Sequence, residues 1–131
     1  MLAAVGNRLA VRTKDLQLVQ RASATIVELG AALDARLLNE RRPAERLRML
    51  RETTNRITRT ANDAIQAYGR ASRAVTAELQ RPNTDPAAAQ EMRQRLDAAR
   101  TEVMAALQVA SLRYPSADTA TAIEGEETAD G

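Results

Sequence analysis

The fold of this chain is decided by residues 2–37, "LAAVGNRLAVRTKDLQLVQRASATIVELGAALDARL", in which apolar residues recur at alternating steps of three and four. Only Arg12 and Ser23 in the series are neither apolar nor glycine. Such a rhythm places one side chain per turn on the same face of an α-helix. It predicts a long helix, over about residues 2–39, with one continuous apolar seam of the heptad type. The seam comprises Leu2, Val5, Leu9, Arg12, Leu16, Val19, Ser23, Ile26, Gly30, Leu33 and Leu37.

The same rhythm returns twice further along the chain. Pro43 suits the first position of a helix, because the N–H that proline lacks would have no partner there. A second helix is therefore predicted over about residues 43–81, and a third over about 86–113, where Asp85 or Thr84 can cap it. The second seam comprises Leu47, Leu50, Thr54, Ile57, Ala61, Ala64, Tyr68, Ala71 and Val75, and ends at Glu78. The third comprises Ala89, Met92, Leu96, Ala99, Val103, Ala106 and Ala110.

Short connections between long helices make neighbouring helices antiparallel. The sequence therefore predicts an all-α fold, an elongated antiparallel three-helix coiled-coil bundle spanning residues 1–114. The alternative is a long helical hairpin that dimerises through the same surfaces. A second stripe on the first helix favours the bundle, because its residues recur every seven positions beside the seam and would meet the third helix. This stripe comprises Ala4, Val11, Leu18, Thr25 and Ala32.

Composition excludes several classes of function. The chain has no cysteine and no histidine, so disulfides, thiolate metal sites and the commonest general base are all missing. It has no glycine-rich phosphate loop and no nucleophile elbow. Aromatic residues make up only 2% of the chain, which leaves few stacking platforms for nucleic-acid bases. We therefore predict a protein that is not an enzyme, that uses no metal or cofactor, and that binds no small-molecule substrate.

Charge divides the chain into two parts. The last 17 residues, 115–131, contain five acids and no base, whereas residues 1–114 contain all 19 basic residues. The low apolar content of residues 115–131 predicts a disordered acidic tail, which we expect to lie over the first turn and compete with an acidic partner. No stretch is apolar enough to span a bilayer. These features predict a cytoplasmic protein.

Arginines and apolar residues gather at the first predicted turn. The third helix is shorter than the first two, so it should reach only the level of Thr54 and Gly30. Beyond that level, Leu38 and Met49 fall outside the predicted seams and have no third helix to cover them. An exposed apolar patch ringed by arginine is typical of a docking surface. The predicted partner-binding residues are Arg36, Leu38, Arg41, Arg42, Arg46 and Met49.

These patterns predict a non-enzymatic helical module for protein–protein interaction or a structural role. Its contact site would be the first turn, where apolar side chains dock and arginines steer an acidic partner. The partner would be another protein or a second copy of the chain, giving a homo-oligomer. The alternative is a peripheral binder of an anionic membrane or of nucleic acid, acting through the basic body. Salt separates these possibilities, because charge-led binding weakens as ionic strength rises.

Overall fold

The computed structural model describes residues 2–82 and 84–114, with side chains from Arg12 onward, and contains three long helices. These are α1 (Leu2–Leu37), α2 (Pro43–Leu79) and α3 (Pro86–Arg113). Each bound lies within two residues of the position predicted from the sequence. The expected caps are also present. Pro43 and Pro86 begin their helices, and Asp85 caps α3 by accepting a hydrogen bond from the Ala87 backbone N–H at 3.0 Å.

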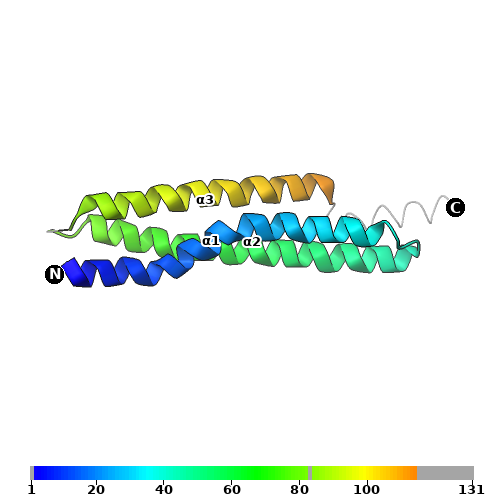
Figure 1. The fold of residues 1–131 in the computed structure, drawn as a ribbon, viewed down its shortest axis with the longest axis horizontal. Helices are drawn as coiled ribbons and strands as arrows, with labels where there is room; N and C mark the ends of the chain where they lie inside the picture. The colour runs from blue at the N-terminus through cyan, green and yellow to red at the C-terminus, as the bar shows by residue number, and fades with distance from the viewer. Residues whose placement is uncertain (1, 83, 115–131) are drawn as a thin grey trace.

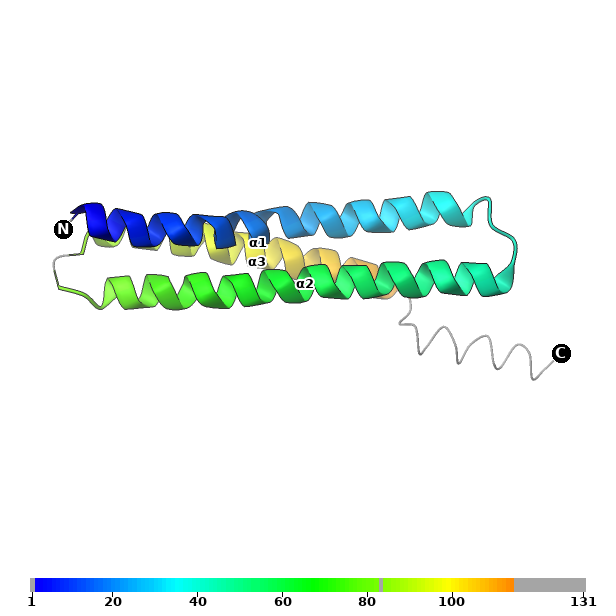
Figure 2. The same ribbon diagram turned by 90° about the horizontal axis from the view of Figure 1, so that it is seen from below.

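The three helices lie side by side in an elongated up-down-up arrangement (Figures 1 and 2). Each helix packs against both of the others. The described part of the chain contains no strand. The prediction of an all-α three-helix bundle is therefore confirmed, and one chain suffices to form it. No described helix is long and apolar enough to cross a lipid bilayer. The predicted acidic tail, residues 115–131, lies outside the described residues.

The core follows most of the predicted seams. Apolar side chains from all three helices fill it in layers, and α2 contributes alanines that are almost completely buried. Alanine on this face allows the neighbouring helices to approach closely, because helix separation depends on the side chains at the contact. The buried residues that the sequence predicted are Leu16, Val19, Ile26, Leu33, Ile57, Ala61, Ala64, Ala71, Val75, Ala89, Leu96, Ala99, Val103 and Ala110.

The first turns of α2 depart from the predicted seam. Met49 and Thr53 are buried there, whereas Leu50 and Thr54 are only half-buried. Met49 is only 8% exposed, so the prediction that it lies uncovered at the tip is wrong. Its side chain joins the core cluster that contains Leu33. The reason is that α2 has only α1 as a neighbour at this level, and the face that α2 turns towards α1 passes through Met49 and Thr53.

The second stripe on α1 does not face α3. Leu18 is 41% exposed and, with Thr25, lines a groove between α1 and α2. The face of α1 that meets α3 instead carries Val27, Gly30 and Ala31. A third helix can pack against either side of a two-helix layer, and both sides of this seam carry small or apolar residues. The prediction that the stripe of Ala4, Val11, Leu18, Thr25 and Ala32 meets α3 is therefore wrong for its described side chains.

The end of α3 lies where the length argument expected it. The Tyr114 hydroxyl lies 2.8 Å from the Gly30 carbonyl oxygen and 2.7 Å from Asp34 Oδ1. The Tyr114 side chain also shares a groove with Thr54. Within the described residues, the α1–α2 hairpin continues beyond this level as two helices alone (Figure 1). We call this overhang, residues 35–50, the hairpin tip.

Candidate functional site: the hairpin tip

The turn that closes the hairpin tip is held by an ion pair between Glu40 and Arg42. Arg42 Nε lies 2.9 Å from Glu40 Oε1, and Arg42 Nη2 lies 3.1 Å from Glu40 Oε2. The backbone N–H of Arg42 donates to the same carboxylate at 3.0 Å. These hydrogen bonds, led by the one from the Arg42 side chain, lower the pKa of Glu40 from 4.5 to about 2. Arg42 therefore already holds a carboxylate of its own chain.

Arg46 is part of the turn itself. Its Nη1 donates to the carbonyl oxygens of Leu37 and Glu40, each at 2.7 Å. The last carbonyls of an α-helix have no partner within the helix and need one from elsewhere. Arg46 supplies that partner at the end of α1, so its guanidinium stabilises the turn from across the hairpin.

Arg48 and its neighbours form a surface network along α2. Arg48 Nη1 lies 2.6 Å from Glu52 Oε1, and its guanidinium also pairs with Glu45. The hydrogen bond from Arg48 lowers the pKa of Glu45. These residues are spaced three and four apart, so they form the interleaved ion pairs of a solvated helix face. Part of the positive charge of this arginine-rich region is therefore neutralised by neighbouring glutamates.

Three of the predicted contact residues remain open for binding. Leu38 is 85% exposed, the most exposed of the large apolar side chains that the structure describes. Arg36 and Arg41 are exposed, and in the described chain neither side chain forms an ion pair or a hydrogen bond. Of the six predicted contact residues, Arg36, Leu38 and Arg41 are thus available, Arg42 and Arg46 are engaged within the turn, and Met49 is buried.

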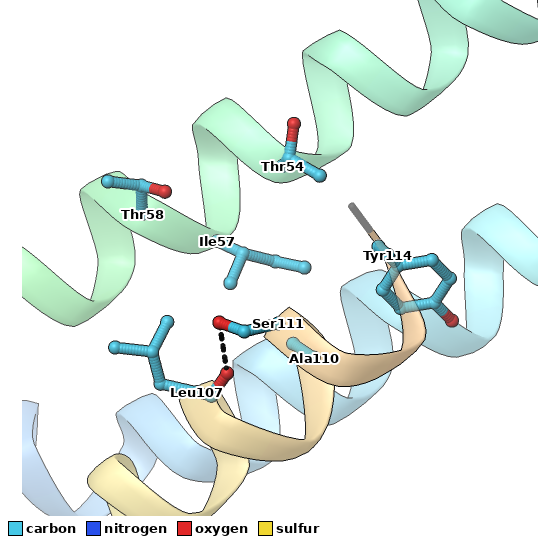
Figure 3. Close-up of a pocket in the computed structure, with 7 residues that line it drawn as sticks. All are labelled: Thr54, Ile57, Thr58, Leu107, Ala110, Ser111 and Tyr114. Carbon is cyan, nitrogen blue, oxygen red and sulfur yellow. Dashed lines mark hydrogen bonds between the residues drawn. The ribbon is translucent and has the colours of Figure 1, made fainter. Parts of the chain in front are cut away.

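The three grooves between the helices differ in their chemistry. Figure 3 shows the groove between α2 and α3, where Thr54, Thr58 and Ser111 bring hydroxyl groups beside Ile57 and Leu107. Ser111 Oγ donates to the Leu107 carbonyl at 2.9 Å, so its proton is used within the helix. The groove between α1 and α2 carries charged and polar walls, including those of Lys14, Gln17, Arg21 and Asp63.

The groove between α1 and α3 is mainly apolar, and sequence reasoning missed it. Val27 and Val109 stand on its two walls, and Asp34 closes its tip end through an ion pair with Arg113 at 2.6 Å between Oδ2 and Nη2. The signal was present in the sequence, because Val27 and Ala31 are four apart and lie outside the first seam. The seven-residue spacing instead predicts the contact with α3 on the stripe of Leu18 and Thr25, which lies on the other side of α1.

Metal-ligating side chains do not cluster in the described residues. No group of three or more acidic side chains gathers there in a way that could hold a metal ion. Some ion pairs lie within one helix, such as that of Asp15 with Arg12 at 3.3 Å, whereas others join different helices, as in Asp15, which binds Arg70 of α2 at 3.0 Å. Tyr68 similarly donates to Asp97 of α3 at 2.7 Å. The contacts between helices hold the bundle together.

The hairpin tip presents one exposed leucine, Leu38, and two arginines, Arg36 and Arg41, that hold no acid among the described residues. The comparisons add no relative to this description: the chain matches no protein-family model, and no curated protein or solved structure matches it either.

Proposed function

We propose that this chain is a non-enzymatic helical module that binds other proteins through its hairpin tip. The observation that carries the proposal is the 85% exposure of Leu38 beside Arg36 and Arg41, whose side chains hold no partner among the described residues. Burying a leucine contributes roughly 2 kcal/mol. Two arginines beside it supply charge-assisted hydrogen bonds to carboxylates. The partner is therefore a protein surface with an apolar pocket and acidic residues around it.

The three-helix body serves as the rigid support for this contact. Because α3 ends at Tyr114, the tip projects beyond the rest of the bundle and meets a partner without obstruction from α3. The turn is held by Arg42 and Arg46, so the contact residues are presented in a fixed geometry. Such preorganisation reduces the entropy lost on binding. We place this activity in the cytoplasm, in keeping with a chain that has no cysteine.

A binder of anionic membrane or nucleic acid that acts through the basic body is the second candidate, and the ion pairs around the hairpin tip argue against a role for the tip in it. Of the arginines around the tip, Arg42 and Arg48 are neutralised by their own glutamates, and Arg46 is turned towards the backbone. Nucleic-acid binding requires several free cations on one face, because its affinity comes mainly from phosphate contacts. Arg36 and Arg41 alone give a weak electrostatic surface.

Site-specific photocrosslinking in the cells that make the protein tests the proposal. A benzophenone amino acid at position 38 should capture a protein, and the same group at Gln94, exposed on α3 far from the tip, should not. Charge reversal in R36E/R41E should reduce capture at position 38 severalfold. Equal capture at both positions, or no protein captured at position 38, would contradict the proposal. Sedimentation with vesicles that contain phosphatidylserine, but not with phosphatidylcholine alone, would favour the membrane alternative.

A further inference from the structure

The groove between α1 and α3 has the most apolar lining of the three grooves described above. It encloses about 440 Å³, and apolar side chains dominate its lining. Val27 on α1 is 63% exposed and Val109 on α3 is 62% exposed, although the two lie on the walls of the same groove. Ala31 and Ala105 add little bulk between them. A helix placed on this groove can therefore approach both α1 and α3 closely.

The exposed apolar residues of both helices continue along this side of the molecule. On α1, Ala31 follows Val27 by four residues, so the two lie on nearly the same face. On α3, Leu112 follows Val109 by three residues and is also exposed. Val27 and Val109, two of the large apolar side chains that are exposed in the described chain, thus line the same groove. A concentration of this kind marks an interaction surface.

The groove has an acidic residue at one end and a basic residue at the other. Two copies of the groove that face each other antiparallel would therefore pair opposite charges. Glu102 lines the end away from the tip, and Arg113 lines the tip end. They are eleven residues apart on α3 and so face the same way. In the described residues Glu102 has no ion pair, while Arg113 binds Asp34 and keeps further donors in a side chain that is more than half exposed. An antiparallel copy of α3 would place acid against base at both ends.

We propose that this groove is the contact surface for a second copy of the chain, packed antiparallel about a two-fold axis. The α1 and α3 helices of both copies then form a four-helix layer, with Val27 and Val109 at its centre. Arg113 meets Glu102 of the partner subunit, and the symmetry repeats the contact. The proposal goes beyond the proposed function, because it uses the groove of Val27 and Val109 and not the tip residues Leu38, Arg36 and Arg41, so either can fail alone.

Mass in solution tests the proposal with a matched pair of variants. The full chain should show twice the chain mass in light scattering, falling to one chain mass on dilution. V109E places a carboxylate in the apolar centre and should weaken association by about a hundredfold. M104E introduces the same residue at a half-exposed apolar position of α3 that does not line the groove, and should leave the mass unchanged. A single-chain mass at every concentration, or a dimer that persists in V109E, would overturn the proposal.

Cysteine crosslinking gives a second test that does not depend on a destabilising change. The chain has no cysteine, so one introduced thiol reports one position. Val109 lies within one turn of the midpoint between Glu102 and Arg113, and two copies of V109C should therefore join rapidly on oxidation. L18C, in the groove between α1 and α2, should not. If photocapture at position 38 succeeds but V109C does not crosslink, the dimer proposal is contradicted and the proposed tip function stands. If V109C crosslinks but no protein is captured at position 38, the proposed tip function is contradicted and the dimer proposal stands.

Discussion

At the scale of single residues, Tyr114 joins the end of α3 to α1. Its ring is buried, and its hydroxyl reaches the Gly30 carbonyl and Asp34 Oδ1. A Cβ at position 30 would lie 3.1 Å from the Tyr114 hydroxyl oxygen, so this packing needs the glycine. The contact explains why an otherwise unfavourable glycine sits inside a long helix.

We predict that Y114F lowers the free energy of unfolding by about 1–2 kcal/mol, because it removes the buried hydroxyl that bonds the end of α3 to α1. Urea unfolding measures the loss. Y68F is the matched control: it removes a hydrogen bond to Asp97 that is exposed to solvent, and should cost less. An equal loss in both variants, or none in Y114F, would show that the buried hydroxyl contributes nothing special.

The free energy of unfolding at alkaline pH also distinguishes Y114F from the unaltered protein. Burial, and then the hydrogen bond to Asp34, raises the pKa of the Tyr114 hydroxyl above its usual 10.0. The folded state therefore holds this proton more tightly than the unfolded state. The resulting stability is fully present below pH 10 and is lost as pH rises through the pKa of the folded protein. Y114F should weaken this alkaline decline, while the raised pKa of Tyr68 keeps part of it in place.

At the scale of elements, the α1–α2 turn is closed by side chains where many helices use a glycine. We predict that R46M lowers the free energy of unfolding by about 1 kcal/mol, since the carbonyls of Leu37 and Glu40 both lose their hydrogen bond from Arg46. R41M makes the same chemical change at an arginine whose side chain has no described partner, and should have almost no effect. Thermal unfolding of the two variants compares them directly, and equal midpoints would refute a structural role for Arg46.

At the scale of the whole molecule, alanines on α2 set the distance between the helices. Ala61, Ala64, Ala67 and Ala71 are almost fully buried along one face. We predict that A67L forces the helices apart and costs about 1–3 kcal/mol, as overpacking of a close-packed core generally does. Ala77 is exposed on the same helix, so A77L should be nearly neutral. The midpoints of urea unfolding of the two variants measure the difference. An A67L midpoint equal to that of A77L would mean that the interior is loosely packed.

Which residues of the hairpin tip remain exposed also depends on the packing of the whole molecule. The sequence placed Leu38 and the arginines at an overhanging turn, because helix lengths can be counted along the chain. It did not predict that Met49 would be buried, or that Arg42 and Arg46 would be used within the turn. Those outcomes depend on how α2 rotates against α1 once no third helix is beside it, and on where long side chains find partners in space.

The sequence by itself determined the three helices, their ends and most of the core. Helix periodicity, proline and the Asp85 cap act over a few residues, so they can be read locally. Only the tertiary structure decided which side of α1 receives α3, and therefore that Val27 and not Leu18 borders the α1–α3 groove. Both sides of the seam are small or apolar. The choice between them rests on packing all three helices at once, as in the fit of Tyr114 over Gly30.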